Sequence, residues 1–200
     1  MSTTTEPAAR PRIGGDREQE ILDATLDVLT DTGYDRLTMD SVATAARASK
    51  ATLYRRWSTK ASLVIDALLS HKEPLTGSDT GDLREDLIGT FCGPGGVTDA
   101  HQVAMLASVM TAVSRDTEFA EAFRRDVIGP KSLVVAEIFE RARARGEIGP
   151  DVDVSLLAPA LPAVVLHRLL LLGEQPTPEL VAQVVDEIIL PAATRATRTT

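Results

Sequence analysis

The stretch at 37–63 constrains the fold more than any other part of this chain, because its capping and apolar residues specify two short helices and the turn between them. Apolar residues recur at helical spacing behind Thr38, which is a favourable N-cap residue. After a three-residue turn, Ser49 can cap a second helix on which Leu53 and Trp57 share one inward face. Such a pair is a helix-turn-helix, the unit that offers its second helix to the major groove of DNA.

The outward side of the second predicted helix carries the side chains expected to meet DNA, and no acidic residue occurs between Ser41 and Ile65. The residues expected to read base edges are Lys50, Ala51, Thr52 and Arg55. The residues expected to hold phosphates are Thr38, Arg47, Tyr54, Arg56 and Lys60. The alternative is an ordinary helical hairpin whose cations are only solvated.

Three segments of this stretch closely resemble the DNA-binding domain of the TetR family of bacterial transcriptional regulators. They are Leu37-Thr38, the run at 49–57 (SKATLYRRW) and the run at 60–63 (KASL). The resemblance implies an all-helical homodimer that binds operator DNA through three N-terminal helices and a small effector through the rest. It also implies phosphate contacts by Thr38, Tyr54 and Lys60, and base contacts by Lys50, Ala51 and Thr52. Arg47 departs from the pattern, since the family often has glycine there. Either a positive φ at Arg47 costs about 1 kcal/mol or more, or the turn is built differently and Arg47 adds a phosphate contact.

Charge is unevenly divided along the chain, whose formal net charge is −8. Residues 1–72 hold ten basic and ten acidic residues, whereas residues 73–200 hold eleven basic and nineteen acidic ones. Phosphate would repel the second part, so a nucleic-acid surface is expected in the first. The single cysteine, Cys92, excludes an intramolecular disulfide, and no signal peptide or membrane span is expected, so the sequence predicts a soluble cytoplasmic protein.

Helical periodicity predicts an all-α fold with three parts. Residues 1–15 are expected to form a disordered arm, which could reach a minor groove through Arg10, Arg12 and Arg17 or be a solubilising tail. Residues 16–72 are expected to form the N-terminal DNA-binding domain with its helix-turn-helix, and residues 73–200 a C-terminal helical bundle for effector binding and dimerisation. Besides the helix-turn-helix, helices are predicted at 16–32, 60–71, 83–91, 99–114, 118–144, 153–172 and 178–190, with a kink at Pro130.

The last two predicted helices are too apolar for one side to remain in water. We therefore expect them to pair with their copies in a four-helix homodimer interface. The residues expected in that interface are Val164, Leu169, Leu171, Val181, Val184, Val185 and Ile188. The alternative is that both helices are buried within a single chain.

An effector pocket is expected among the helices of the second part. Its predicted lining consists of aromatic residues, adaptable methionines, one leucine and one histidine: Phe91, Met105, Met110, Phe119, Phe123, Leu133 and His167. Each of them could equally be an ordinary core residue. A ligand in this lining would be mostly apolar with a few polar groups.

The sequence does not predict an enzyme, a metal site or a cofactor. No histidine follows a glutamate at the spacing of di-iron helices, and the glycines at 93–96 lack the lysine that ends a phosphate-binding loop. The predicted function is a repressor released by its effector from a pseudo-palindromic operator, with recognition helices about one helical turn of DNA (~35 Å) apart. Two alternatives are a constitutive DNA-binding factor and a redox-responsive regulator that uses Cys92.

Overall fold

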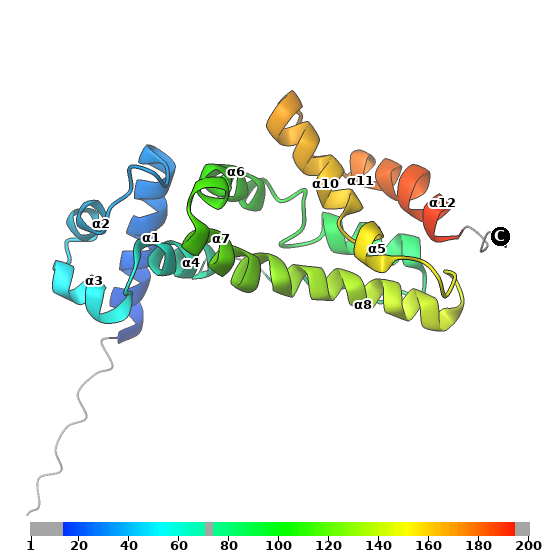
Figure 1. Ribbon diagram of the computed structural model, residues 1–200, viewed down its shortest axis with the longest axis horizontal. Helices are drawn as coiled ribbons and strands as arrows, with labels where there is room; N and C mark the ends of the chain where they lie inside the picture. Colours follow the sequence, from blue (N-terminus) through cyan, green and yellow to red (C-terminus); the bar gives the residue numbers. More distant parts are fainter. Residues whose placement is uncertain (1–13, 71–73, 195–200) are drawn as a thin grey trace, which may run out of the picture. The chain divides into compact units, whose positions relative to one another are not determined.

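The computed structural model describes residues 14–70 and 74–194, all of them in helices, turns and loops without a strand. The chain divides into two compact units, Met1–Ser70 and His71–Thr200. Figure 1 labels most of the α-helices of both units. The all-α fold class is therefore confirmed, whereas the predicted arm, with Arg10 and Arg12, lies outside the described residues.

Unit 1 is a small bundle in which the first helix packs against two of the other three. Helix α1 packs against α2 and α4, and α2 packs against α3. The bounds are α1 Gly14–Thr32, α2 Met39–Ala45, α3 Lys50–Arg56 and α4 Lys60–Ser70. Leu53, Leu63 and Val64 are completely buried in this bundle, and burying each such side chain contributes about 1.5–3 kcal/mol.

Unit 2 contains the remaining helices, several of which include a π-helical turn. The α-helices are α5 Leu83–Cys92, α6 Ala100–Arg115, α7 Thr117–Phe123, α8 Gly129–Arg145, α9 Val154–Leu157, α10 Ala160–His167, α11 Pro178–Val184 and α12 Leu190–Ala193. The π turns are η1 Arg124–Ile128, η2 Arg168–Leu172 and η3 Val185–Ile189. Helix α5 contacts α8, α11 and η3, and α10 contacts α11 (Figure 1).

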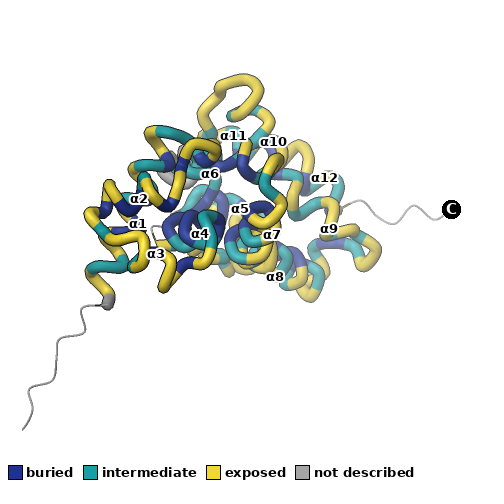
Figure 2. The backbone as a smooth tube through the Cα atoms, turned by 60° about the vertical axis from the view of Figure 1, so that its left-hand side comes forward, coloured by how far each residue is buried: buried dark blue, intermediate teal, exposed yellow. Residues whose placement is uncertain are grey.

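The core of unit 2 lies where α5, α8, α10 and α11 face one another, and buried positions alternate with exposed ones along each of these helices (Figure 2). Leu87, Ile138 and Leu161 are each fully buried there. Because α5, α8 and α10 each contribute one of these residues, the core depends on contacts between segments far apart in the sequence.

Each predicted helix is found at its expected position, but three of them, at 118–144, 153–172 and 178–190, are each divided into two α-helices and a π turn, and the kink predicted at Pro130 takes a different form. Proline has no N–H to give to the carbonyl one turn earlier, so an ordinary helix would be disrupted there. The chain instead widens into η1 directly before α8, where the Gly129 N–H donates to the Arg124 carbonyl. A π turn of this kind absorbs one extra residue without ending the helix.

Three of the residues predicted in the dimer interface belong instead to the core of unit 2. Val181, Val184 and Val185 are at most 3% exposed within the single chain, where they contribute to the contacts of α11 and η3 with α5 and α10. The periodicity showed an apolar face but could not show whether another part of the same chain covers it. Of the others, Val164 and Leu169 are half-buried, and Leu171 and Ile188 are exposed.

One segment of the described chain matches a membrane span in length and composition only, which does not overturn the expectation that the chain has no span. The 19 residues of Val154–Leu172 are long and apolar enough by length and composition, and only 11% of the apolar window is buried. Proline interrupts this stretch between α9 and α10, and Leu161 and Val165 pack into the core of unit 2. Its opposite side, including Leu170, Leu171 and Leu172, is exposed.

Candidate functional site

The turn between α2 and α3 is held by backbone hydrogen bonds around a residue in the left-handed conformation. Arg47 has a φ of 49°, and no other non-glycine residue of the described chain has a positive φ. The Ala48 N–H donates to the Ala43 carbonyl at 2.8 Å, and the Arg47 N–H donates to the Thr44 carbonyl at 3.1 Å. This is the Schellman arrangement, which usually employs glycine at the position of Arg47.

Arg17 supports this turn from α1. Its guanidinium donates to the carbonyl oxygens of Ala46 and Arg47, both at 2.8 Å, and also pairs with Glu20. The structure therefore corrects the proposal that Arg17 belongs to a flexible arm, since its side chain braces the helix-turn-helix. Its partners are 29 and 30 positions away in the chain, so no local spacing could have indicated the contact.

Helix α3 is fixed at both ends and along its inner face. The Ser49 side chain accepts from the Thr52 N–H at 3.1 Å, as expected of an N-cap. Leu53 is fully buried and Trp57 is 2% exposed. The Trp57 indole N–H donates to Asp66 on α4 at 2.8 Å. The position of α3 thus depends on α2 and on α4.

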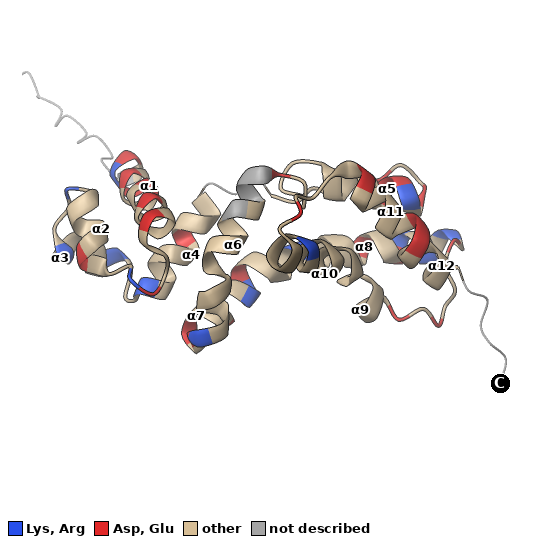
Figure 3. Cartoon of the chain, turned by 90° about the horizontal axis from the view of Figure 1, so that it is seen from above, with Lys and Arg blue, Asp and Glu red and all other residues tan. Residues whose placement is uncertain are grey.

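The outer side of α3 leaves most of the predicted DNA-contacting side chains in solvent. Lys50, Ala51, Tyr54 and Arg55 are exposed, whereas Thr52 is half-buried and its hydroxyl lies 2.9 Å from that of Ser49. Figure 3 marks the positions of the basic residues of α3 in blue and of the acidic residues of α1 in red. The recognition helix therefore has an accessible face with positive charge.

Two of these cations already have carboxylate partners in unit 1. Lys50 Nζ lies 2.6 Å from Asp40 of α2, and the hydrogen bond raises the pKa of Lys50. Arg56 lies 3.0 Å from Glu18 of α1, and the hydrogen bond likewise raises the pKa of Arg56. Because the segment between Ser41 and Ile65 contains no acid, the sequence alone did not indicate that acids from flanking helices reach its cations.

Two of the predicted phosphate contacts have structural roles as well. Thr38 caps α2, accepting from the Ser41 N–H at 3.1 Å, and remains exposed. Lys60 is half-buried; its ammonium donates to the Tyr34 carbonyl at 3.0 Å and lies 4.0 Å from the centre of the Tyr34 ring. Lys60 therefore joins the start of α4 to the segment that precedes α2.

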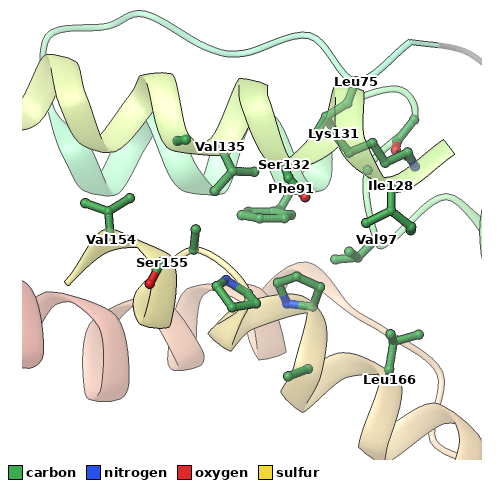
Figure 4. Close-up of a pocket in the computed structure, with 17 residues that line it drawn as sticks. Leu75, Phe91, Val97, Ile128, Lys131, Ser132, Val135, Val154, Ser155 and Leu166 are labelled. Carbon is green, nitrogen blue, oxygen red and sulfur yellow. Dashed lines mark hydrogen bonds between the residues drawn. The ribbon is translucent and has the colours of Figure 1, made fainter. Parts of the chain in front are cut away.

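Unit 2 contains a cavity of about 690 Å³, a size typical of small-molecule sites. Positions 128, 131, 132, 135 and 136 line it from η1 and α8, at helical spacing. The loop after α5 and the segment from α9 to α10 supply much of the remaining wall (Figure 4). Most of the lining is apolar, and its polar side chains are Lys131, Ser132 and Ser155.

Of the predicted pocket residues, Phe91 lines this cavity and the other six do not. Phe119 and Phe123 are buried and stack on each other with ring centres 5.8 Å apart. Leu133 is 66% exposed because it lies on the other side of α8 from the lining positions. The three remaining residues also lie outside the lining: Met105 and Met110 are half-buried on α6, and His167 is exposed at the end of α10.

The structure gives no support to the redox alternative. Cys92 is half-buried, and burial raises the pKa of its thiol, which lowers the fraction of reactive thiolate. Within the described residues, no group of three or more His, Cys, Asp or Glu side chains is placed to hold a metal ion.

A braced helix-turn-helix in one unit and a ligand-sized cavity in a second helical unit define a helix-turn-helix transcriptional regulator of two domains. The family model for bacterial regulatory proteins of the tetR family matches residues 21–67, and the model for the tetracyclin repressor-like C-terminal domain matches residues 78–188. The chain therefore belongs to the TetR family of transcriptional regulators.

Individual relatives agree with this assignment over nearly the whole chain. A DNA-binding transcriptional repressor TetR of Mycobacteroides abscessus is 37% identical, covering 88% of this chain and 94% of its own. An uncharacterized HTH-type transcriptional regulator of Mycobacterium tuberculosis is 35% identical, covering 90% of each chain. The crystal structure of the TetR family regulator SCO0332 is 31% identical, with a TM-score of 0.67 over 88% of this chain and 98% of that one.

Proposed function

We propose that this protein is a homodimeric repressor that binds a pseudo-palindromic operator through α3 and leaves it when a small, mostly apolar effector binds. The observation that carries the DNA-binding part is the exposed cationic side of α3 on a helix fixed by Arg17, Leu53 and Trp57. The repressor role is supported by the Mycobacteroides abscessus relative, which is a DNA-binding transcriptional repressor.

The residue roles in this proposal follow from exposure and charge. Base edges are read by Lys50, Ala51, Thr52 and Arg55, and phosphates are held by Thr38, Arg47, Tyr54, Arg56 and Lys60. When the protein binds DNA, Lys50 gives up part of its contact with Asp40, and Arg56 gives up part of its contact with Glu18, to contact the DNA. Because exposed ion pairs in water are weak, this exchange is a small obstacle to binding.

The dimer is proposed to form through the exposed apolar side of α10 and η2. Leu170, Leu171 and Leu172 are between 40% and 73% exposed, and Ile188 of η3 is 45% exposed. Contiguous exposed leucines of this kind mark an interaction surface. A symmetric partner would cover this surface and place two α3 helices on one operator.

The effector is proposed to bind in the cavity of unit 2. A ligand releases DNA only to the extent that it prefers the conformation that binds DNA poorly. The cavity is bounded by Ile128 of η1 and by residues of α10, which also carries part of the proposed dimer surface. Occupying it would therefore change the dimer geometry that sets the separation of the two α3 helices.

The test has two measurements on the purified full chain and DNA from upstream of its own gene. Nuclease footprinting locates the bound sequence, and fluorescence anisotropy measures binding with and without candidate effectors. We expect protection of a pseudo-palindrome whose half-sites are about one helical turn apart or slightly more, and loss of binding with an active effector. Binding that is equal on upstream and random DNA would contradict sequence-specific regulation. Specific binding that no cavity ligand alters would leave a constitutive regulator.

A further inference from the structure

Helix α3 begins with a lysine whose charge is met by a carboxylate from another helix. Lys50 is the first residue of α3, and the first turn of α3 contains no acidic residue. A positive charge at this end of a helix is unfavourable, because the N-terminus of the helix dipole is itself positive. Asp40 of α2 supplies a negative charge there, since its Oδ2 atom lies 2.6 Å from Lys50 Nζ. The ion pair therefore stabilises Lys50 where α3 begins.

The backbone on both sides of this ion pair is fixed by helix caps. Thr38 and Ser41 form a capping box around the start of α2, where Asp40 lies in the first turn. Ser49, directly before Lys50, is the N-cap of α3. The freedom that remains lies in the two charged side chains, and the ion pair restricts both of them.

The ion pair stays open to solvent and to DNA. The Lys50 side chain is 62% exposed and that of Asp40 is 59% exposed. An ammonium group has three donors, so Lys50 can contact a base while it keeps part of its contact with Asp40. A long side chain that is held in place before binding also loses less conformational entropy on binding. A phosphate that lies away from Asp40, in contrast, can be reached only if the ion pair breaks.

We infer that Asp40 is a specificity-determining residue: it holds the Lys50 ammonium where Lys50 reads a base and limits the use of Lys50 on the phosphates of unrelated DNA. This inference rests on the base-reading role proposed for Lys50. On random DNA, a lysine freed from Asp40 would gain a phosphate contact that the paired lysine does not make. The Asp40 carboxylate therefore weakens binding to random DNA more than binding to the operator, and raises the ratio of the two affinities.

The first experiment compares the full chain with its Asp40→Asn variant, which keeps the shape of the side chain and removes its charge. Fluorescence anisotropy measures the affinity for the operator and for a random duplex of equal length over a series of salt concentrations. Because an exposed ion pair is weak, we expect affinity for random DNA to rise roughly two- to fivefold and the ratio of operator to random affinity to fall by a similar factor. An unchanged or increased ratio would overturn the inference.

The salt dependence on random DNA gives a second reading of the same change. The slope of the logarithm of the binding constant against the logarithm of salt concentration should be greater in magnitude by about one in Asp40→Asn, because Lys50 is free to hold one more phosphate. Both expected changes strengthen binding to random DNA, which a misfolded variant would not do. An unchanged slope would show that Asp40 does not restrain Lys50.

A carboxylate near DNA also repels phosphate directly, and Lys50→Met separates this effect from the restraint of Lys50. In the Lys50→Met background, Asp40→Asn should change the ratio of affinities little. An equal fall of the ratio in both backgrounds would indicate general repulsion and overturn the inference. Asp40→Glu keeps a carboxylate within reach of Lys50 and should retain most of the wild-type ratio.

Asp27→Asn is the matched control, since it removes one negative charge from an exposed position of α1, away from the ion pairs of α3. It should leave the ratio of affinities unchanged. A fall equal to that of Asp40→Asn would assign the effect to the net charge of the protein and not to Asp40.

The same measurements distinguish this inference from the proposed function. If the wild-type protein prefers its operator and neither the ratio nor the salt slope changes in Asp40→Asn, the inference fails and the proposed function holds. If the wild-type protein binds operator and random DNA equally, the proposed function fails, and the specificity role of Asp40 fails with it. A steeper salt slope in that case would show only that Asp40 restrains Lys50.

Discussion

Arg55 and Arg56 are adjacent on α3, yet their surroundings differ. Arg56 pairs with Glu18 and lies 5.9 Å from the Trp57 ring centre, whereas Arg55 is exposed on the outer side. We expect Arg55→Ala to weaken operator binding by roughly 1–3 kcal/mol and to change base preference, because a base contact would be lost. Arg56→Ala is the comparison and should weaken binding to all DNA sequences alike. Fluorescence anisotropy on a set of base-substituted operators measures the affinity of both variants for each operator. An equal loss of affinity on all operators with Arg55→Ala would show that Arg55 contacts phosphate instead of bases.

Arg47 combines an unfavourable backbone conformation with a proposed phosphate contact, and two substitutions separate these effects. Arg47→Gly and Arg47→Ala both remove the charge, but only glycine relieves the left-handed strain. We expect the glycine variant to have a higher free energy of unfolding than the alanine variant by about 1 kcal/mol in urea denaturation. In both variants, the slope of the logarithm of the DNA-binding constant against the logarithm of salt concentration should be smaller in magnitude by about one. An unchanged slope would show that Arg47 does not touch phosphate.

At the scale of elements, the junction of α3 and α4 depends on the hydrogen bond from Trp57 to Asp66. Asp66→Ala would leave the nearly buried indole N–H without this acceptor and should cost about 1–3 kcal/mol of unfolding free energy. Asp66→Asn retains an acceptor oxygen and should cost less. Thermal and urea unfolding of the two variants checks this order, and equal stability of both with the wild type would show that the bond does not hold α3 in place.

The helices and caps were predictable because they depend on neighbouring residues. Thr38 and Ser49 cap α2 and α3 as expected, and Arg47 has the positive φ considered for that turn. Partners from distant parts of the chain were not predictable. Periodicity along α8 marks an apolar face, but only the fold determines that Val135 meets the core while Leu133 meets solvent.

The cations of α3 also show that contacts between distant parts of the chain could not be predicted from the sequence. Their exposure follows from helical periodicity around Leu53, whereas their pairing with Asp40 and Glu18 follows from the packing of α1 and α2. The cavity could not be located from sequence for the same reason. Its lining comes from several separate segments, and the two aromatic residues Phe119 and Phe123, which matched the expected composition, instead stack on each other.

For the whole molecule, the proposed dimer raises the question of which apolar residues would hold two copies together. Leu171 of η2 is 73% exposed, whereas Val185 of η3 is completely buried in its own chain. In a two-fold symmetric dimer each interface residue occurs twice, so a charge at position 171 would disrupt both copies of the contact. The buried Val185 instead stabilises the fold of each protomer.

We therefore expect Leu171→Glu to yield folded monomers and Val185→Glu to unfold unit 2. Sedimentation velocity distinguishes monomer from dimer, and circular dichroism shows whether the helices persist. Burying one leucine contributes about 1.5–3 kcal/mol, and its loss on both sides of the interface should weaken association by at least tenfold. Operator binding should fall with dimerisation, because one protomer places only one α3 helix on the DNA. If Leu171→Glu remains a dimer of unchanged affinity, the subunits meet through another surface.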